Sequence, residues 1–415
     1  MNVLKPPDMI LTDVLVPASM VAQPERFGGR RHDDCLMGDL VIRDGRVVGM
    51  NASDPGKHPR GMVLPALSEC HVHLDKCHTI SRMNGVGGDL QSAIDAQARD
   101  RVNWTQDDLR VRAMRGLTEL VDAGCNLARS HVDWSSGGDA TEPPMAWHVL
   151  CDIADDMRGR VELQLAALID LDELADPAIA EAIAKSIAAR NGVFGAFVLD
   201  QPNRRDGIES AFRVADRFDL MLDFHVDEGL APDLDGLELI ADVAIATGHQ
   251  GPILCGHACS LMNLNQSSLK KVSDKLLQAG ITVASLPATN LFLQGRASGT
   301  PDRRGVTRIA ELRAAGVPVV VGTDNVRDAF CPLGRHDPRQ SLALAALAAH
   351  LDPPFGDYLP MISTSARTAL GLAPIHVDDA AIGDLVLFDA TSTSDLLAST
   401  SGPRPLAGVL QGAAP

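Results

Sequence analysis

Residues 64–76 read LPALSECHVHLDK, in which an apolar run leads into two histidines two positions apart. Because side chains two apart on a β-strand point to the same face, His71 and His73 would converge on one point. Two neutral imidazoles that converge in this way suit a metal ion. A surface strand that carries two histidines by chance has the same local pattern, so the pair alone leaves both interpretations open.

The chain around this stretch alternates apolar strands with helical segments. Residues 105–124 illustrate the helices, with Thr105 as N-cap and Gly124 as the stop signal. Eight strand–helix units over residues 61–375 predict an α/β fold, a (β/α)8 TIM-type barrel. The eight expected strands cover residues 61–73, 125–134, 161–168, 192–199, 220–228, 252–259, 281–287 and 317–324.

Both ends of the chain have a different pattern from the middle. Residues 1–60 alternate apolar and polar positions and contain RDGR, a hairpin signal, at 43–46. Residues 381–390 form another short strand pattern. We expect residues 1–60 plus 376–415 to build a small β-sandwich domain.

The composition restricts the partners. The 415 residues carry a formal net charge of -17, which argues against nucleic acid and anionic membranes. No stretch approaches 18 apolar residues, so no transmembrane helix is expected. Asp8 and Asp13 interrupt the first apolar segment, which is unlike a signal peptide, and a cytoplasmic location is expected. The eight cysteines include no CxxC pair, which disfavours a thiolate zinc site.

Polar residues cluster where the expected strands end. Catalytic groups of (β/α)8 barrels sit at the carboxyl ends of the strands, so these residues would meet at one mouth. A lone histidine is more often structural, but the whole set together predicts an active site. The set comprises His71, His73, His131, His225, Glu228, His257 and Asp324.

Four motifs in this order carry a family resemblance. They are HVHLDK (71–76), FHVDE (224–228), GHACS (256–260) and GTDNVRDAF (322–330). Over roughly residues 60–375 the chain resembles the amidohydrolase superfamily, in particular the bacterial cytosine deaminases and more distantly the N-isopropylammelide amidohydrolases.

The resemblance implies a mononuclear metal site and an acid/base pair. It implies hydrolytic deamination of an amino-substituted N-heterocycle, cytosine or a close analogue, in which metal-bound hydroxide attacks and ammonia leaves. Glu228 matches the group that moves protons to the ring, His257 matches the one that polarises the hydroxide, and Asp324 would also accept the water's proton. The expected ligands of one Zn2+ or Fe2+ are His71, His73, His225 and Asp324. Residues 192–199 contain no lysine to bridge a second metal.

Four further positions are expected to contact the substrate. Asp170 stands where cytosine deaminases have a glutamine, and it either reads the substrate's edge or caps a helix. Asn325 replaces a second aspartate, as in the N-isopropylammelide amidohydrolases, and Phe330 replaces a tryptophan. Lys76 follows the ligand motif directly. These departures from the cytosine deaminases predict that the deamination chemistry is retained and that the substrate differs.

Two alternatives to the leading function stay open. The first is an amidohydrolase that releases an amine from an N-substituted aminotriazine. The second, of another class, is a non-catalytic barrel that only binds a ligand. The expected partner in each case is a small N-heterocyclic molecule, with a homo-oligomer possible in principle.

Overall fold

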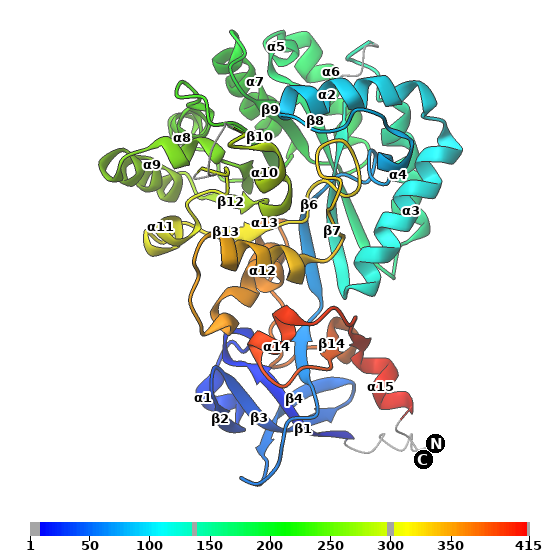
Figure 1. Ribbon diagram of the computed structural model, residues 1–415, viewed down its shortest axis with the longest axis vertical. Helices are drawn as coiled ribbons and strands as arrows, with labels where there is room; N and C mark the ends of the chain where they lie inside the picture. The colour runs from blue at the N-terminus through cyan, green and yellow to red at the C-terminus, as the bar shows by residue number, and fades with distance from the viewer. Residues whose placement is uncertain (1–8, 135–138, 297–302, 413–415) are drawn as a thin grey trace.

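The computed structural model describes residues 9–134, 139–296 and 303–412. In Figure 1 a helix-covered barrel lies above a smaller sheet built from both ends of the chain. Residues 1–8 and 413–415, which belong to the expected terminal β domain, lie outside the described part.

Eight parallel strands form the barrel, which confirms the predicted (β/α)8 fold. Neighbouring strands pair in chain order from β6 to β13. An isolated parallel bridge between Val72 and Asp324 joins the first and last strands, so the barrel is nearly closed. The strands are β6 (Leu67–Val72), β7 (Cys125–Asp133), β8 (Glu162–Asp170), β9 (Phe194–Val198), β10 (Leu222–Val226), β11 (Ile253–His257), β12 (Ile281–Ser285) and β13 (Val319–Val321).

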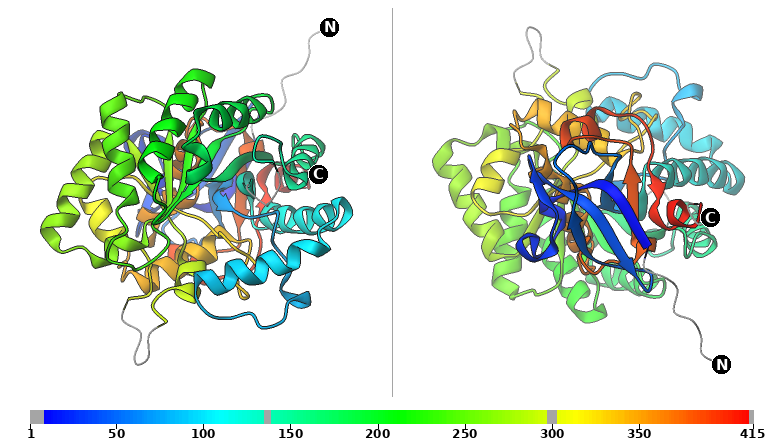
Figure 2. Two further views of the ribbon diagram at one scale, coloured as in Figure 1. Left: turned by 90° about the horizontal axis from the view of Figure 1, so that it is seen from above. Right: turned by 90° about the horizontal axis from the view of Figure 1, so that it is seen from below.

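Helices surround the barrel, as the view from above in Figure 2 shows. The N-cap expected at Thr105 is present, because its hydroxyl accepts a 3.2 Å hydrogen bond from the Asp108 backbone N–H. The helices are α1 (Pro24–Phe27), α2 (Leu90–Asp100), α3 (Gln106–Asp122), α4 (Met145–Asp156), α5 (Leu171–Leu174), α6 (Pro177–Ala188), α7 (Arg204–Phe218), α8 (Gly236–Thr247), α9 (Gln266–Gln278), α10 (Pro287–Leu293), α11 (Ile309–Ala314), α12 (Pro338–Ala348), α13 (Thr364–Ala369), α14 (Thr393–Ala398) and α15 (Leu406–Gly412).

The two ends of the chain share one connected seven-stranded sheet. Its order is β15-β14-β5-β1-β3-β2, with β4 paired to β3. At the hairpin between β3 and β4, Asp44 and Gly45 have φ values of 50° and 75°, which a tight primed turn requires. The strands are β1 (Met9–Pro17), β2 (Arg30–His32), β3 (Cys35–Arg43), β4 (Arg46–Ala52), β5 (Met62–Pro65), β14 (Leu385–Phe388) and β15 (Arg404–Pro405).

The strand expected over residues 61–73 is two strands in different sheets. β5 pairs with β14 and β1 in the terminal sheet, and β6 pairs with β7 in the barrel. Every residue of both strands is buried, although β6 includes the polar side chains of Ser68, Glu69 and His71. Pro65 ends β5 because it has no N–H for the ladder. The terminal sheet therefore extends to Pro65, a few residues beyond the expected boundary at residue 60.

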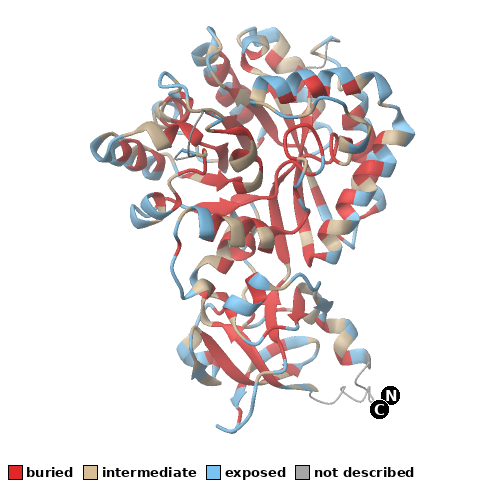
Figure 3. Cartoon of the chain, in the orientation of Figure 1, coloured by how far each residue is buried: buried red, intermediate tan, exposed pale blue. Residues whose placement is uncertain are grey.

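The strands of the barrel are largely buried, as the red ribbons in Figure 3 show. The interior of the barrel nonetheless contains charge, since Arg129 Nη1 donates a 2.8 Å hydrogen bond to Asp223 Oδ2 and both side chains are buried. The Gln164 side chain accepts from the same guanidinium at 2.7 Å. A buried pair of this kind is tolerated when its hydrogen bonds are made.

Across the described ranges, the helices are too short or too polar for any of them to traverse a bilayer.

Candidate active site

Four ligand-type side chains from three strands converge at the mouth of the barrel. His73 Nε2 lies 3.0 Å from His225 Nε2 and 3.3 Å from Asp324 Oδ1. His71 Nε2 lies 3.6 Å from the same carboxylate oxygen. All four side chains are buried. The structure thus brings together the set His71, His73, His225 and Asp324 that the sequence motifs single out.

The donor atoms of this cluster fit a metal ion. Both ring nitrogens of His71, Nδ1 of His73 and of His225, and both carboxylate oxygens of Asp324 have no hydrogen-bond partner among the described residues. Buried polar atoms are almost always satisfied, so the unpaired atoms of His71 and Asp324 within this cluster fit a site that binds a ligand. Three imidazoles and one carboxylate form a donor set that Zn2+ and Fe2+ accept, with a coordination position left for water.

The charge states of these residues also suit a metal ion. Burial, followed by the neighbouring imidazoles, lowers the pKa of His71 and of His225 well below the ordinary histidine value. Metal ions bind the neutral imidazole, so the environment favours the ligating form. Burial opposes ionisation of Asp324, but the close approach of His73 and the charge of His257 outweigh burial and lower the carboxyl pKa.

Glu228 and His257 stand beside this cluster. Glu228 Oε1 lies 3.7 Å from His257 Nδ1. Burial and the charge of Asp324 raise the pKa of Glu228 well above the ordinary value, which favours the protonated carboxyl. Burial lowers the pKa of His257 to about 4, so the ring is neutral near pH 7. The amide nitrogen of Asn290 lies 3.1 Å from His257 Nδ1, and an amide N–H donates, so the ring proton sits on Nε2.

His257 and Asp324 have a strained backbone conformation. His257 has φ 69° and Asp324 has φ 60°, the left-handed region that non-glycine residues rarely adopt. Such strain concentrates at functional sites, where the surrounding structure holds it in place.

One cavity of about 240 Å³ is lined by His73, His225, Glu228 and His257 and by three of the four expected substrate contacts. Lys76, Asn325 and Phe330 line it, as the sequence analysis expected. Further lining residues come from α2 and from the ends of β7 to β9, and the sequence analysis did not single them out. These residues are Leu90, Ile94, Gln97, Arg101, Asp133, Leu168, Phe197 and Leu199.

Comparison with known proteins decides the family. The model of the amidohydrolase family matches residues 171–400. A pterin deaminase of Rhizobium rhizogenes (strain K84) is 30% identical over 414 residues, covering 97% of this chain and 93% of that protein. The chain belongs to the amidohydrolase family.

Two further proteins are similar to this amidohydrolase, one in sequence and one in structure. The N-isopropylammelide isopropyl amidohydrolase of Pseudomonas sp. (strain ADP) is 19% identical and covers 87% of this chain and 88% of that protein. The crystal structure of 5-methylcytosine deaminase from Klebsiella pneumoniae superposes with a TM-score of 0.78 at 23% identity, covering 96% of each chain. The second likeness establishes the fold.

Lys76 of this amidohydrolase is part of a charged group at the cavity wall. Its Nζ donates a 2.7 Å hydrogen bond to Asp133 Oδ1 and lies 5.0 Å from the centre of the Phe330 ring. Arg101 Nη2 donates to the other oxygen of Asp133 at 2.5 Å. Burial disfavours the ammonium, but Asp133 and Asp75 outweigh burial and raise the pKa of Lys76. Lys76 is therefore a fixed cation at the edge of the cavity.

Asp170 does not line the cavity. Its carboxylate accepts a 3.1 Å hydrogen bond from the Asp172 backbone N–H and caps α5. Leu168, two residues earlier on β8, lines the cavity instead. An aspartate directly before a helical turn is a favoured N-cap, and the helix-cap alternative describes this side chain.

His131 belongs to the predicted active-site set but is not among the expected metal ligands. It is fully buried, and its ring centre lies 4.0 Å from that of His71 and 4.5 Å from that of His225. Its Nε2 lies 3.8 Å from Asp223 Oδ1, which ties the cluster to the Arg129–Asp223 pair inside the barrel. The available signal was its place at the end of the strand over residues 125–134.

A second group of ligand-type side chains lies apart from this cavity. His336 Nδ1 and His78 Nε2 lie 2.9 Å and 3.2 Å from Glu119 Oε2, and Arg115 Nε lies 3.0 Å from Glu119 Oε1. A hydrogen bond between His336 and Glu119 and the ion pair with Arg115 account for two of these contacts, whereas His78 Nε2 has no hydrogen-bond partner among the described residues.

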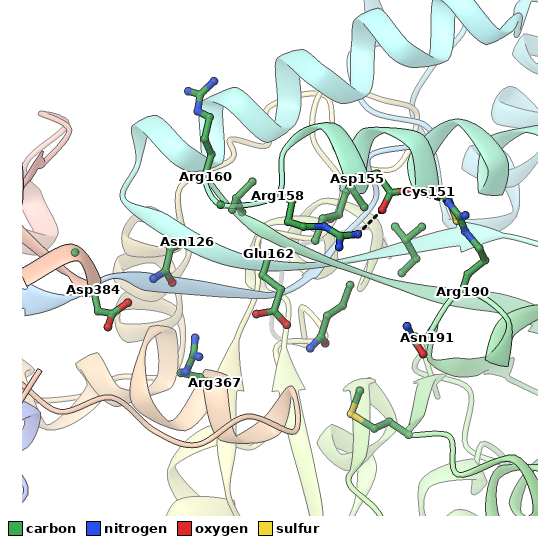
Figure 4. Close-up of a pocket in the computed structure, with 18 of the residues that line it drawn as sticks. Asn126, Cys151, Asp155, Arg158, Arg160, Glu162, Arg190, Asn191, Arg367 and Asp384 are labelled. Carbon is green, nitrogen blue, oxygen red and sulfur yellow. Dashed lines mark hydrogen bonds and ion pairs between the residues drawn. The ribbon is translucent and has the colours of Figure 1, made fainter. Parts of the chain in front are cut away.

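A larger cavity of about 840 Å³ lies at the opposite, amino-terminal ends of β8 to β10. Figure 4 shows its charged lining, in which Arg158 pairs with Asp155 and Glu162 and Arg367 face the same space. No histidine lines it among the described residues. The histidine cluster lies at the smaller cavity, which His73, His225 and His257 line.

Proposed function

We propose that this amidohydrolase catalyses hydrolytic deamination of an amino-substituted N-heterocycle and releases ammonia. The observation that carries the proposal is the single cavity that exposes His73, His225, Glu228 and His257 together. One divalent metal ion, Zn2+ or Fe2+, would be held by His71, His73, His225 and Asp324. A barrel that only binds a ligand would not need an acid/base group beside the ligand cluster.

The chemistry divides between the metal ion and the chain. When bound, the metal ion supplies a water activated for attack on the carbon that carries the amino group. Glu228, whose raised pKa keeps its carboxyl protonated, donates a proton to the adjacent ring nitrogen. The Glu228 carboxylate would then take up the proton that the attacking water gives up and pass it to the departing amino group, so that the carbon–nitrogen bond breaks, ammonia leaves and a ring carbonyl remains. His257 donates a hydrogen bond from Nε2 to the oxygen that attacks.

The substrate we favour is a pterin-type ring, a bicyclic heterocycle with a 2-amino and a 4-oxo group. The support is the pterin deaminase relative, which matches 97% of this chain. The walls of the cavity include Leu168, Phe197 and Phe330, which suit the faces of a flat ring. Cytosine, the first expectation from the sequence motifs, is the second candidate, supported by the resemblance of FHVDE and GHACS.

The test is a comparison of three ring classes on metal-loaded protein. Ammonia release is measured with 2-amino-4-oxopteridine, with cytosine and with an aminotriazine, and alkylamine release is measured with an N-alkylaminotriazine. We expect the highest kcat/KM with the pteridine and no turnover after chelation. Absence of ammonia release from every ring at full metal content would contradict the proposal, and faster alkylamine release would favour the aminotriazine alternative.

A further inference from the structure

Gln97 is a polar side chain at a position where the fold expects an apolar one. On α2 the buried positions are Ala93, Ala96, Gln97 and Asp100, which share one helix face. The two alanines pack in an apolar cluster with Leu293, Ala329 and Phe330. Only 2% of Gln97 is exposed, although its neighbours Ala98 and Arg99 are exposed. Gln97 is therefore a buried amide that lines the cavity from a largely apolar helix face.

Neither end of the Gln97 amide is satisfied by the described part of the chain. Its Nε2 and its Oε1 are both buried and both lack a hydrogen-bond partner there. Buried amide groups are nearly always hydrogen-bonded, because burial without a partner forfeits the bonds that water would make. Gln97 lines the same cavity as Glu228 and His257, so a molecule in that cavity can supply the missing partners.

The helix that carries Gln97 is held firmly at its carboxyl end. Asp100 accepts hydrogen bonds from Arg82 Nε at 2.7 Å and from Trp104 Nε1 at 2.9 Å. One turn beyond Gln97, Arg101 is bonded to Asp133. These contacts fix the backbone that carries the Gln97 amide at the cavity wall. Selective recognition requires a side chain that is held in this way.

We propose that Gln97 is a specificity residue that pairs with a lactam edge of the substrate, a ring N–H next to a ring carbonyl. A primary amide offers one acceptor and one donor side by side, and a lactam offers the complementary pair. A ring that lacks the N–H and carbonyl pair would leave the buried Gln97 amide without hydrogen bonds. Binding sites with a buried polar group discriminate strongly against ligands that leave the group unpaired. The inference rests on the proposed function, because the cavity must hold a heterocycle for the pairing to form.

The test compares two rings that differ only at this edge. 2-Amino-4-oxopteridine carries the lactam and 2-aminopteridine lacks it. We expect wild-type kcat/KM to favour the lactam ring, and Gln97→Met to reduce that preference by about 10- to 100-fold, through the loss of one or two hydrogen bonds. Gln91→Met is the matched control, because Gln91 lies on the exposed face of the same helix and bonds only to Asp95 among the contacts recorded for it.

A second variant and a binding measurement separate recognition from folding and from turnover. Gln97→Leu keeps a side chain of similar size but removes both the donor and the acceptor, so it should also weaken pairing with the lactam edge. Calorimetry with 2,4-dioxopteridine, which has the lactam and no amino group to lose, should give a Kd about 10- to 100-fold weaker in both variants. Thermal unfolding of each variant checks that the fold is retained.

The outcomes distinguish the two proposals. Deamination with an unchanged lactam preference in both Gln97 variants would overturn the role of Gln97 and leave the proposed function standing. Lactam binding that depends on Gln97, without deamination of any ring, would overturn the proposed function and support the role of Gln97. An equal loss for both rings, together with a lower Tm, would show that Gln97 is structural and overturn the inference.

Discussion

Asp324 contacts His71 through both its backbone and its side chain. The Asp324 N–H donates a 2.8 Å hydrogen bond to the His71 carbonyl, and Asp324 Oδ1 lies 3.6 Å from His71 Nε2. The first contact belongs to the bridge that joins β13 to β6, and the second belongs to the candidate metal site. The same pair of residues therefore joins the two edges of the barrel and contributes to the candidate metal site. We expect metal binding to stabilise the closed barrel for this reason.

We predict one divalent metal per chain, lost in His225→Ala. The reason is that His225 Nε2 lies 3.0 Å from His73 Nε2 within the only ligand cluster that lines the catalytic cavity among the described residues. Metal analysis of purified protein measures this, with exposed His148→Ala as control. A second equivalent that disappears in His336→Ala would instead place a metal at His78, Glu119 and His336, and the single-metal prediction would be wrong.

We predict that Glu228→Gln folds and keeps its metal but loses turnover by about 10²- to 10⁴-fold. The amide cannot carry the proton that the raised pKa of Glu228 makes available. Rates and metal content are measured together, with exposed Glu142→Gln as control. Turnover close to that of the wild type would mean that another group moves the proton.

Gly256→Ala should weaken metal binding although residue 256 touches no metal. A Cβ at Gly256 would lie 2.8 Å from Cε1 and 3.0 Å from Nδ1 of His71, so the ring must move. Changes that misplace a ligand typically cost about 10- to 100-fold in metal affinity. Competition with a chromophoric chelator measures this, and Gly383→Ala, where a Cβ meets open space, is the control. Unchanged affinity would show that β11 shifts to accommodate the methyl group.

Asp100→Asn should lower stability at neutral pH and have little effect in acid. Burial raises the pKa of Asp100, but hydrogen bonds from Arg82 and Trp104 outweigh it and the net pKa is lowered. A carboxyl with a lower pKa in the folded state stabilises the fold above its unfolded pKa of about 3.9, and loses this contribution as the pH falls further. Denaturant unfolding of metal-free protein should show a deficit of about 1–3 kcal/mol at pH 7 that shrinks below pH 4.

The control for this pH effect is Asp95→Asn on the exposed face of the same helix, where little change is expected at any pH. A deficit for Asp100→Asn that stays constant down to pH 3 would assign the loss to packing and not to the ionised carboxylate.

Asp170→Ala should cost stability without altering substrate preference. The carboxylate caps α5, and loss of an aspartate N-cap costs about 0.5–2 kcal/mol. The ratio of kcat/KM for cytosine to that for isocytosine should stay as in the wild type, because Leu168 and not Asp170 lines the cavity. A shift of tenfold or more in that ratio would place Asp170 in contact with the substrate.

The sequence by itself determined the eight strands of the barrel and the residues at their ends. Apolar runs between helical segments depend on local periodicity, which the chain order preserves. His71, His73, His225, Glu228, His257 and Asp324 follow such runs directly, so the barrel topology alone brings them to one mouth.

Only the tertiary structure decided which remaining side chains face the cavity. Asp170 and Lys76 are both charged residues just past strand ends, yet one caps a helix and the other meets Asp133 across the cavity wall. Gln97 lies on a helix outside the strand pattern and reaches the cavity because α2 folds over the mouth. The direction of a side chain beyond a strand end depends on the turn that follows and on partners distant in sequence. Local periodicity encodes neither, and packing of the whole chain determines both.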